Sequence, residues 1–310
     1  MAQTRVLQRR IRSVKNAKQI TKALEVVAAS RMRRVVDVAP RSRAYGDLAA
    51  EIMQRLTHNQ ETKQHPFFAP ASDLPTLPTG RQAGQADKPA LYIVITSDRG
   101  QAGAFNSNIF NLAISQIRIE KHRPQVVAIG RKGARFFANL SGIDFKGAYE
   151  NIADIPDVNV FSPLVEMIEE SMHTGSIGSV KLIYTQFISS LSQKAASFSL
   201  LPIDLSQAQA DEAEKNQPVR EKSEMVYELE PDVGDVLEEA IKLYFEAKLM
   251  QARVESAASE HAMRMVAMGN ANRNASDLID DLTLELNATR QAAITQEIAE
   301  ITGGGEAIAK

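Results

Sequence analysis

The sequence predicts an α+β or α/β fold in which two long terminal helices form an antiparallel coiled coil and carry an inserted Rossmann-like α/β domain. Apolar residues recur three or four positions apart near both ends of the chain, which is the spacing of a helical stripe. Between them, strand-like and helix-like runs alternate. The expected segments are a helix over 1–60, an insertion over 61–89, an α/β domain over 90–230, a helix over 231–302 and a tail over 303–310.

The N-terminal helix is predicted from an apolar stripe close to the spacing of a coiled-coil seam. The members of the stripe are Leu7, Ile11, Val14, Ala17, Ile20, Leu24 and Val27. Pro40 lacks an amide hydrogen and its ring clashes with the preceding turn, so a kink or a break is expected there. Gly46 is a second weak point, and the segment is therefore either one bent helix or two helices.

The middle of the chain alternates in the manner of crossover units, which favours a sheet that is at least partly parallel. The expected strands are 91–96, 126–129, 180–184 and 198–201, and the expected helices run from the first strand to 119, over 131–140 and over 163–173. Prolines crowd the stretch 64–89, which is typical of a linker or a surface insertion. Residues 204–222 are polar and predict a loop.

The C-terminal helix is predicted from a run without proline between residues 232 and 302. Its apolar positions alternate spacings of four and three over Val236, Ala240, Leu243, Ala247, Met250, Val254 and Ala257. After a slip near His261, the stripe resumes at Ile279, Leu282, Leu286 and Ala293. The glycine run 303–305 is expected to end the helix, because glycine adopts the backbone conformations of a C-terminal stop.

The charges of the two ends predict that they pair with each other. Residues 1–60 contain thirteen basic and four acidic side chains, whereas residues 232–301 contain thirteen acidic and six basic ones. Exposed ion pairs add little stability, but opposite fields select the partner and the register. Because the inserted domain begins and ends in one place, the pairing is expected to be antiparallel.

Composition excludes several classes of function. The chain of 310 residues has no cysteine, so disulfides, thiol catalysis and cysteine-built zinc sites are excluded. No apolar run is long enough to span a bilayer. The first 36 residues are rich in arginine and poor in acids, as in a transit peptide, but the helical pattern continues beyond them, which favours mature protein.

A basic first helix is also compatible with nucleic-acid binding, so a basic-helix adaptor protein is kept as the alternative function. Against it, the first 44 residues contain no aromatic side chain on which a base can stack. A second rival is a nucleotide-dependent enzyme built on the α/β domain. The turn over residues 97–103 follows a strand and precedes a helix, where phosphate-binding loops lie, but it has neither of the glycine patterns of such loops.

No catalytic, cofactor or metal site is predicted. Asp277, Asp280 and Asp281 are close on one helix, yet a straight helix offers too few converging oxygens for a hard cation, and a solvated face is the simpler interpretation. His261 is followed by methionines at 263, 265 and 268, which are more typical of core filling than of a soft-metal site.

Four stretches together resemble the gamma subunit family of bacterial-type F-type ATP synthases. They are residues 20–33, residues 91–106 with Thr-Ser-Asp-Arg-Gly over 96–100, residues 259–268, and residues 288–307 with Thr295, Glu297, Glu300 and Gly304 at the expected positions. They occur in the family's order and cover nearly the whole chain. The chain departs from the family at Gly305, where alanine is usual, and in the turn 100–104, which lacks the cysteine of many members.

The resemblance implies a non-catalytic rotor, the central stalk of a proton-transporting ATP synthase at the cytoplasmic side of the cell membrane, which regulates ATPase activity and proton flow. Its implied partners are the alpha and beta subunits, the epsilon subunit and the membrane-embedded c-ring, with no cofactor and no nucleic acid. By the same resemblance, Arg290 and Gln291 touch a loop of the beta subunit near the upper end of the shaft. Lys22, Leu24 and Val27 lie near an acidic segment of beta.

Overall fold

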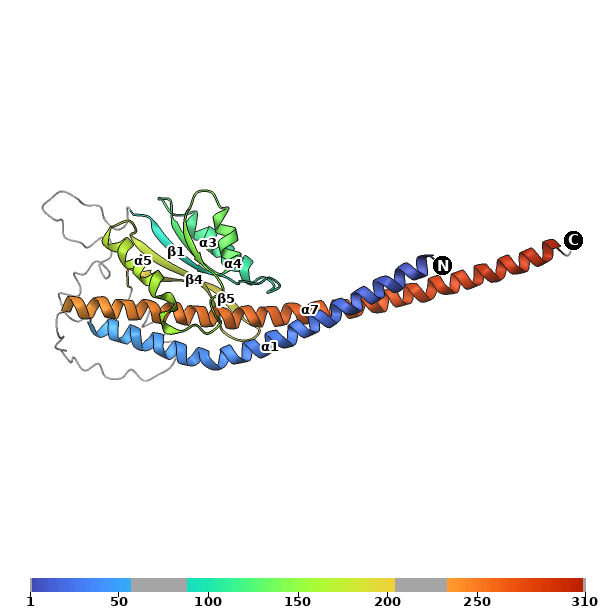
Figure 1. Ribbon diagram of the computed structural model, residues 1–310, viewed down its shortest axis with the longest axis horizontal. Helices are drawn as coiled ribbons and strands as arrows, with labels where there is room; N and C mark the ends of the chain where they lie inside the picture. The colour runs from blue at the N-terminus through green and yellow to red at the C-terminus, as the bar shows by residue number, and fades with distance from the viewer. Residues whose placement is uncertain (1, 57–87, 204–232, 309–310) are drawn as a thin grey trace. The chain divides into compact units, whose positions relative to one another are not determined.

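The computed structural model describes residues 2–56, 88–203 and 233–308 (Figure 1). Residue contacts divide the chain into two compact units: Met1–Ser30 with Arg264–Lys310, and Arg31–Met263. We call them the helical unit and the α/β unit. The expected loop over 204–222, and all but the last two residues of the expected insertion over 61–89, lie outside the described residues.

Two long helices come from the ends of the chain, as the sequence predicts. Helix α1 is Ala2–Leu56 and helix α7 is Val233–Ile308. The break considered at Pro40 does not occur. Helix α1 is continuous through Pro40, whose side chain is exposed. The expected stop at 303–305 is also wrong, since the glycines lie inside α7 and the helix continues to Ile308.

The seam of α1 corrects the predicted apolar stripe. Buried and half-buried residues recur at alternating spacings of four and three at Leu7, Ile11, Val14, Lys18, Thr21, Glu25 and Ala28. The predicted stripe departs from this spacing at Ala17. Ile20 and Val27, which it placed at the seam, are 61% and 50% exposed. The true frame was hidden because it contains the polar residues Lys18, Thr21 and Glu25, which are half-buried at the seam.

The α/β unit contains one five-stranded sheet with the order β3-β2-β1-β4-β5. The strands are β1 Ala90–Ile95, β2 Gln125–Ile129, β3 Asp144–Tyr149, β4 Ser179–Phe187 and β5 Gln193–Leu201. All neighbouring strands are parallel except β4 and β5, which form an antiparallel hairpin. This confirms the partly parallel sheet and adds β3, which the sequence did not predict.

Helices cover both faces of the sheet. They are α3 Phe105–Ile117, α4 Arg131–Ala138 and α5 Ser162–His173, with a short 3₁₀ turn, η2 Val158–Phe161, before α5. On one face, alternate residues of β1 pack with α5 and the first half of α7, and on the other face the intervening residues pack with α3 and α4. Because both faces are covered, all six residues of β1 are buried, as expected for a central parallel strand.

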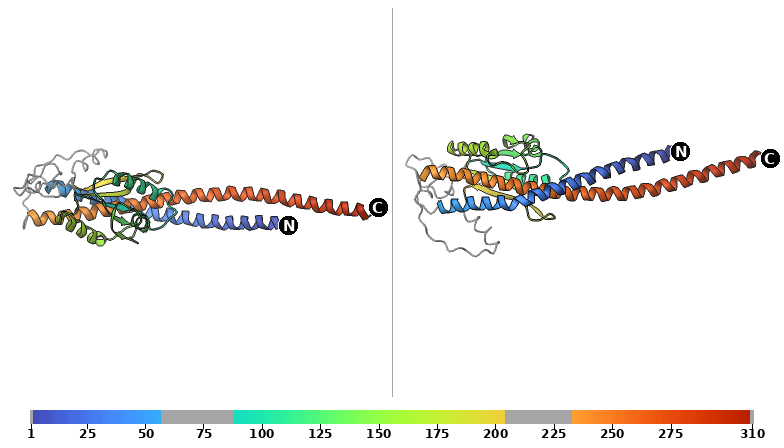
Figure 2. Two further views of the ribbon diagram at one scale, coloured as in Figure 1. Left: turned by 90° about the horizontal axis from the view of Figure 1, so that it is seen from above. Right: turned by 60° about the horizontal axis from the view of Figure 1, so that its bottom comes forward.

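Within the α/β unit, the last part of α1 lies beside the first part of α7 (Figures 1 and 2). Gly46 of α1 approaches α7 so closely that a Cβ atom there would overlap Oε1 of Gln251. Arg43 of α1 donates to Glu255 of α7, with 2.9 Å between Nη2 and Oε1, and the Glu255 side chain is only 3% exposed. Burial alone would lower the pKa of Arg43, but the Glu255 carboxylate outweighs it, and the pKa is raised.

Candidate partner-contact surface

In the helical unit, α1 and α7 run antiparallel, and α7 continues past the first turn of α1 (Figures 1 and 2). Few side chains there are fully buried; they include Leu7 and Ala28 of α1 and Met268 of α7. Glu25 lies opposite Gly269, where an added Cβ atom would be in ordinary van der Waals contact with its carboxyl group. A two-helix unit with so thin a core leaves most of its side chains available to another molecule.

The predicted contact residues on α1 lie beside the seam. Lys22 is exposed and pairs with Glu25 on the next turn, with 3.2 Å between Nζ and Oε2. Val27 is half exposed, and Leu24 is half-buried against the seam. Lys22 and Val27 therefore present a positive charge and an apolar group to solvent.

Arg290 and Gln291 are both exposed on the last third of α7. The structure does not bring them to the α1 residues: Glu25 lies opposite Gly269, and Arg290 is about 30 Å further along the helix at 1.5 Å per residue. The five predicted residues thus form two zones, one around Lys22 and one around Arg290.

Sequence reasoning named Val27 but missed the other exposed apolar residues of this surface. Large apolar side chains that are at least 45% exposed occur on both helices of the helical unit: Val6, Ile20, Val26, Val27, Leu278, Leu284, Ile294, Ile298 and Ile301. The available signal was their position outside the four-and-three frame of the seam. Where these exposed apolar side chains adjoin one another, we expect the surface to contact other proteins.

The turn over residues 97–103 holds neighbouring segments of the α/β unit together. Oδ1 of Asp98 accepts the backbone N–H groups of Arg131, at the start of α4, and Asn151. Ser97 is held by Asn106, whose Oδ1 accepts the Ser97 N–H at 3.1 Å. The Asp98 carboxylate therefore lies at the N-terminus of α4, whereas the helix that follows this turn is α3.

The other candidate sites also have structural explanations. Asp277, Asp280 and Asp281 are exposed, and no three acidic or histidine side chains of residues 2–56, 88–203 and 233–308 gather closely enough to hold a metal ion. His261 is buried and its Nε2 lies 2.8 Å from Oδ2 of Asp154. Desolvation raises the pKa of this carboxyl, but the His261 hydrogen bond and the nearby Arg253 outweigh it, and the pKa is lowered.

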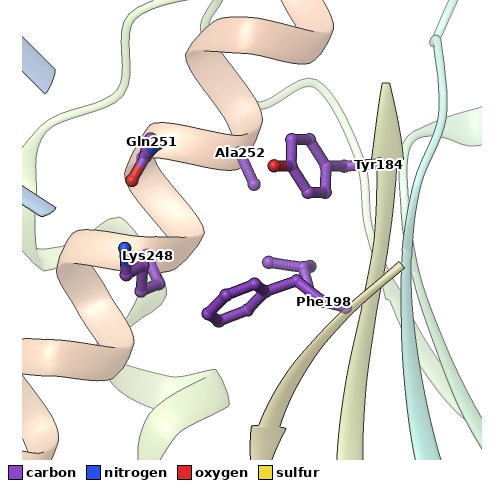
Figure 3. Close-up of a pocket in the computed structure, with 6 residues that line it drawn as sticks. Tyr184, Phe198, Lys248, Gln251 and Ala252 are labelled. Carbon is purple, nitrogen blue, oxygen red and sulfur yellow. The ribbon is translucent and has the colours of Figure 1, made fainter. Parts of the chain in front are cut away.

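A small hollow lies between α7 and the hairpin of β4 and β5 (Figure 3). Tyr184, Phe198, Lys248 and Gln251 line it, and its volume is about 30 Å³. The Nζ atom of Lys248 lies 5.4 Å from the centre of the Phe198 ring, a cation–π contact. The hollow has room for about one water molecule and is far smaller than a nucleotide pocket.

A half-buried cluster ties the end of α3 to the sheet. Glu120 accepts hydrogen bonds from Tyr92 of β1 and Lys181 of β4, at 2.5 and 2.8 Å. Desolvation raises the pKa of Glu120, but these two bonds outweigh it and lower the pKa; desolvation and Glu120 both raise the pKa of Tyr92. Tyr92, Glu120 and Lys181 provide hydrogen-bond partners for one another, which is typical of a cluster that stabilises the fold.

Comparison with known proteins decides the family. A family model described as ATP synthase matches residues 3–308. The ATP synthase gamma chain of Stenotrophomonas maltophilia (strain R551-3) is 34% identical over 99% of this chain and 100% of its own length. The gamma chain of Desulfitobacterium hafniense (strain DSM 10664 / DCB-2) is also 34% identical, with the same coverage. The chain belongs to the ATP synthase gamma chain family.

Solved structures agree with this gamma-chain fold. The rotor of the Euglena gracilis mitochondrial ATP synthase is similar with a TM-score of 0.59 and 20% identity, over 94% of this chain and 99% of that one. The central stalk and c-ring structure of the Tetrahymena thermophila mitochondrial ATP synthase is similar with a TM-score of 0.57 and 23% identity, over 81% of this chain and 99% of that one. The departures at the turn 100–104 and at Gly305 lie within a chain that matches gamma chains along its length.

Proposed function

We propose that this gamma chain is the central-stalk rotor of a proton-transporting ATP synthase. It couples ion flow through a membrane ring to conformational change at the catalytic sites of beta subunits, and so regulates ATPase activity and proton flow. The observation that carries the proposal is the match to gamma chains over 99% of the sequence. In this proposal residues 1–60 and 231–302 form the shaft, and residues 90–230 form its foot.

The partners of the rotor are the alpha and beta subunits around the shaft, the epsilon subunit, and the c-ring below. None of the helices within the described ranges is both long and apolar enough to cross a membrane. In this proposal the chain is held at the cytoplasmic side of the cell membrane through its complex. It contributes no catalytic residue and no cofactor; the chemistry takes place on its neighbours.

Two zones of the shaft contact the beta subunits. Arg290 and Gln291 meet a loop of beta near the upper end, and Lys22, Leu24 and Val27 meet an acidic segment lower down. The exposure of Lys22 and Arg290 supports these contacts, since a charge on a stalk that turns past successive partners must be accessible from solvent. In this proposal the two contacts lie at different heights on the partner, which agrees with the distance of about 30 Å along α7 from Gly269, opposite Glu25, to Arg290.

The basic-helix adaptor is not supported. The relatives that match over the full length are gamma chains. The basic charge of the first helix is accounted for by its acidic partner helix and by contacts with acidic protein segments.

Membrane vesicles containing the complete complex test the proposal. With this chain, a proton gradient should drive ATP synthesis, and without it synthesis should be absent. Arg290→Ala should reduce synthesis partially, because torque is spread over many contacts and one rim charge contributes about 1 kcal/mol or less. Arg135→Ala, also exposed but on α4, is the matched control and should be neutral. Unchanged or wholly abolished synthesis with Arg290→Ala would contradict the two-zone contact.

A further inference from the structure

The stretch 252–262 of α7 is unusual because every residue in it is buried, although six of its eleven side chains are polar or charged. The polar members are Arg253, Glu255, Ser256, Ser259, Glu260 and His261. A helix enclosed by protein on all sides is normally apolar all round. Buried polar groups cost free energy unless they are hydrogen-bonded, so the bonds that these side chains make identify what they do.

The two serines of this stretch, Ser256 and Ser259, form hydrogen bonds with the edge of strand β4. The pairing of β1 with β4 ends at Ile183, so among the described strands none pairs with the backbone of Thr185 on that side. The N–H group of Thr185 donates to Oγ of Ser256 at 3.2 Å, and Oγ of Ser259 donates to the Thr185 carbonyl at 3.3 Å. All three residues are at most 2% exposed. The two hydroxyls therefore take the place of a neighbouring strand at the carboxyl end of β4.

Two other side chains hold the loop that follows β3. Nη2 of Arg253 donates to the carbonyl of Ile152 at 2.8 Å and lies 3.5 Å from Oδ1 of Asp154. The ring of His261 donates from Nε2 to the other oxygen of Asp154, because an ionised carboxylate can only accept. The Arg253 and His261 side chains are 6% and 3% exposed. This loop is thereby fixed to α7 by a charge-assisted network.

The two sets of hydrogen bonds hold α7 on different sides of the helix. At about 100° per residue, the Ser256 and Ser259 side of the helix is about 130° away from the Arg253 and His261 side. Residues 253–261 span about 12 Å along the axis. Apolar packing is non-directional, whereas hydrogen bonds fix distance and angle. Bonds on two sides and at several heights therefore oppose both rotation of α7 about its axis and sliding along it.

We propose that Arg253, Ser256, Ser259 and His261 of α7, with Thr185 and Asp154, form a torque-bearing junction that locks α7 to the sheet of the α/β unit. The proposal rests on the rotor function. Torque that enters through the α/β domain reaches the shaft only if α7 cannot turn against the sheet. Because α7 is one continuous helix to Ile308, a lock at 253–261 passes rotation directly into the part that meets the catalytic head. The four α7 side chains are positioning residues.

The test measures coupling in vesicles that contain the complete complex, as ATP-driven proton pumping per ATP hydrolysed. In Ser256→Ala/Ser259→Ala, the buried backbone groups of Thr185 lose their partners, which lowers the equilibrium constant for the locked junction by a factor of about ten for each bond. Pumping per ATP should fall by about half or more while ATP hydrolysis continues, since the junction slips under load. His261→Leu should lower the same ratio.

Two variants control for a merely structural effect. His261→Gln keeps a donor toward Asp154 and should restore the pumping ratio. Ser42→Ala removes a buried hydroxyl that makes no hydrogen bond among the described residues and should leave the ratio unchanged. If the serine and leucine variants melt earlier but pump normally per ATP at temperatures where they are folded, the junction proposal is overturned. If the wild-type chain itself supports no pumping, the rotor function fails instead.

Discussion

Gly130→Ala is expected to destabilise the chain by about 3 kcal/mol. Gly130 joins β2 to α4 with φ of 106° and ψ of 143°, a conformation that side chains other than glycine rarely adopt. A Cβ atom there would also overlap the backbone carbonyl of Thr96, which cannot move aside because the Thr96 N–H is bonded to Ile129 at 2.7 Å. Backbone strain and overpacking each cost about 1–3 kcal/mol. Chemical denaturation measures the loss.

Substitutions at two other glycines distinguish the cost of backbone strain from the cost of steric overlap. Gly142 has φ of 90°, but nothing lies within 4 Å of its added Cβ, so Gly142→Ala should cost only the strain, about 1 kcal/mol. Gly147 has neither a positive φ nor a neighbour, and Gly147→Ala should be close to neutral. Equal losses at 130 and 142 would show that the approach of Thr96 does not matter.

Arg43→Met is expected to destabilise the pairing of α1 with α7 in the α/β unit by about 2 kcal/mol. It leaves the Glu255 carboxylate, 3% exposed, with a single hydrogen bond from Gln251 at 3.2 Å among the bonds described. Removing one partner of a buried ion pair costs about 3–5 kcal/mol. The expected value is lower here because the Arg43 side chain is 39% exposed and partly screened.

The double variant Arg43→Met/Glu255→Met should recover most of that loss. With both charges gone, neither is left buried and unpaired, and the added apolar groups pack in the seam. Denaturation of the two single variants and the double variant gives the coupling energy as a double-mutant cycle. If the double variant loses as much as the sum of the single variants, the pair does not act as a unit.

The sheet shows which strands a sequence reveals. The central strand β1 is buried on both faces and therefore appears as a continuous apolar run, and β2 does so for the same reason. Strand β3 was missed because it is an edge strand with no fully buried residue and a sequence, DFKGAY, without an apolar run. Its pairing with β2 depends on distant contacts that local patterning does not contain.

The helices show the limit of apolar periodicity. Both were predicted, but the frame of α1 was misassigned after Val14, because polar Lys18, Thr21 and Glu25 occupy the seam while Ile20 and Val27 face outward. The stripe of α7 slips near His261 for a different reason: residues 252–262 are enclosed on all sides, so no single face is apolar. At 303–305 helix continuity prevailed over the preference of glycine for a stop.

The candidate contact residues were chosen by resemblance, and the sequence alone gave no reason to prefer them. Nothing in the local pattern distinguishes Arg290 from other arginines on the helices. The sequence did contain a more general signal for a partner-contact surface, because apolar residues such as Ile20 and Val26 lie outside the spacing of the seam. A seam assigned from the correct heptads would have marked these outward positions as candidates for contact with other proteins.

Single-molecule rotation tests the central claim most directly. The chain has no cysteine, so Ser107→Cys at an exposed position on α3 provides one attachment point for a bead. The chain is assembled with alpha and beta subunits, whose head is fixed to glass, and ATP is added. Continuous rotation of the bead in one direction is the predicted result. A bead that stays still while the same heads hydrolyse ATP would contradict the rotor account.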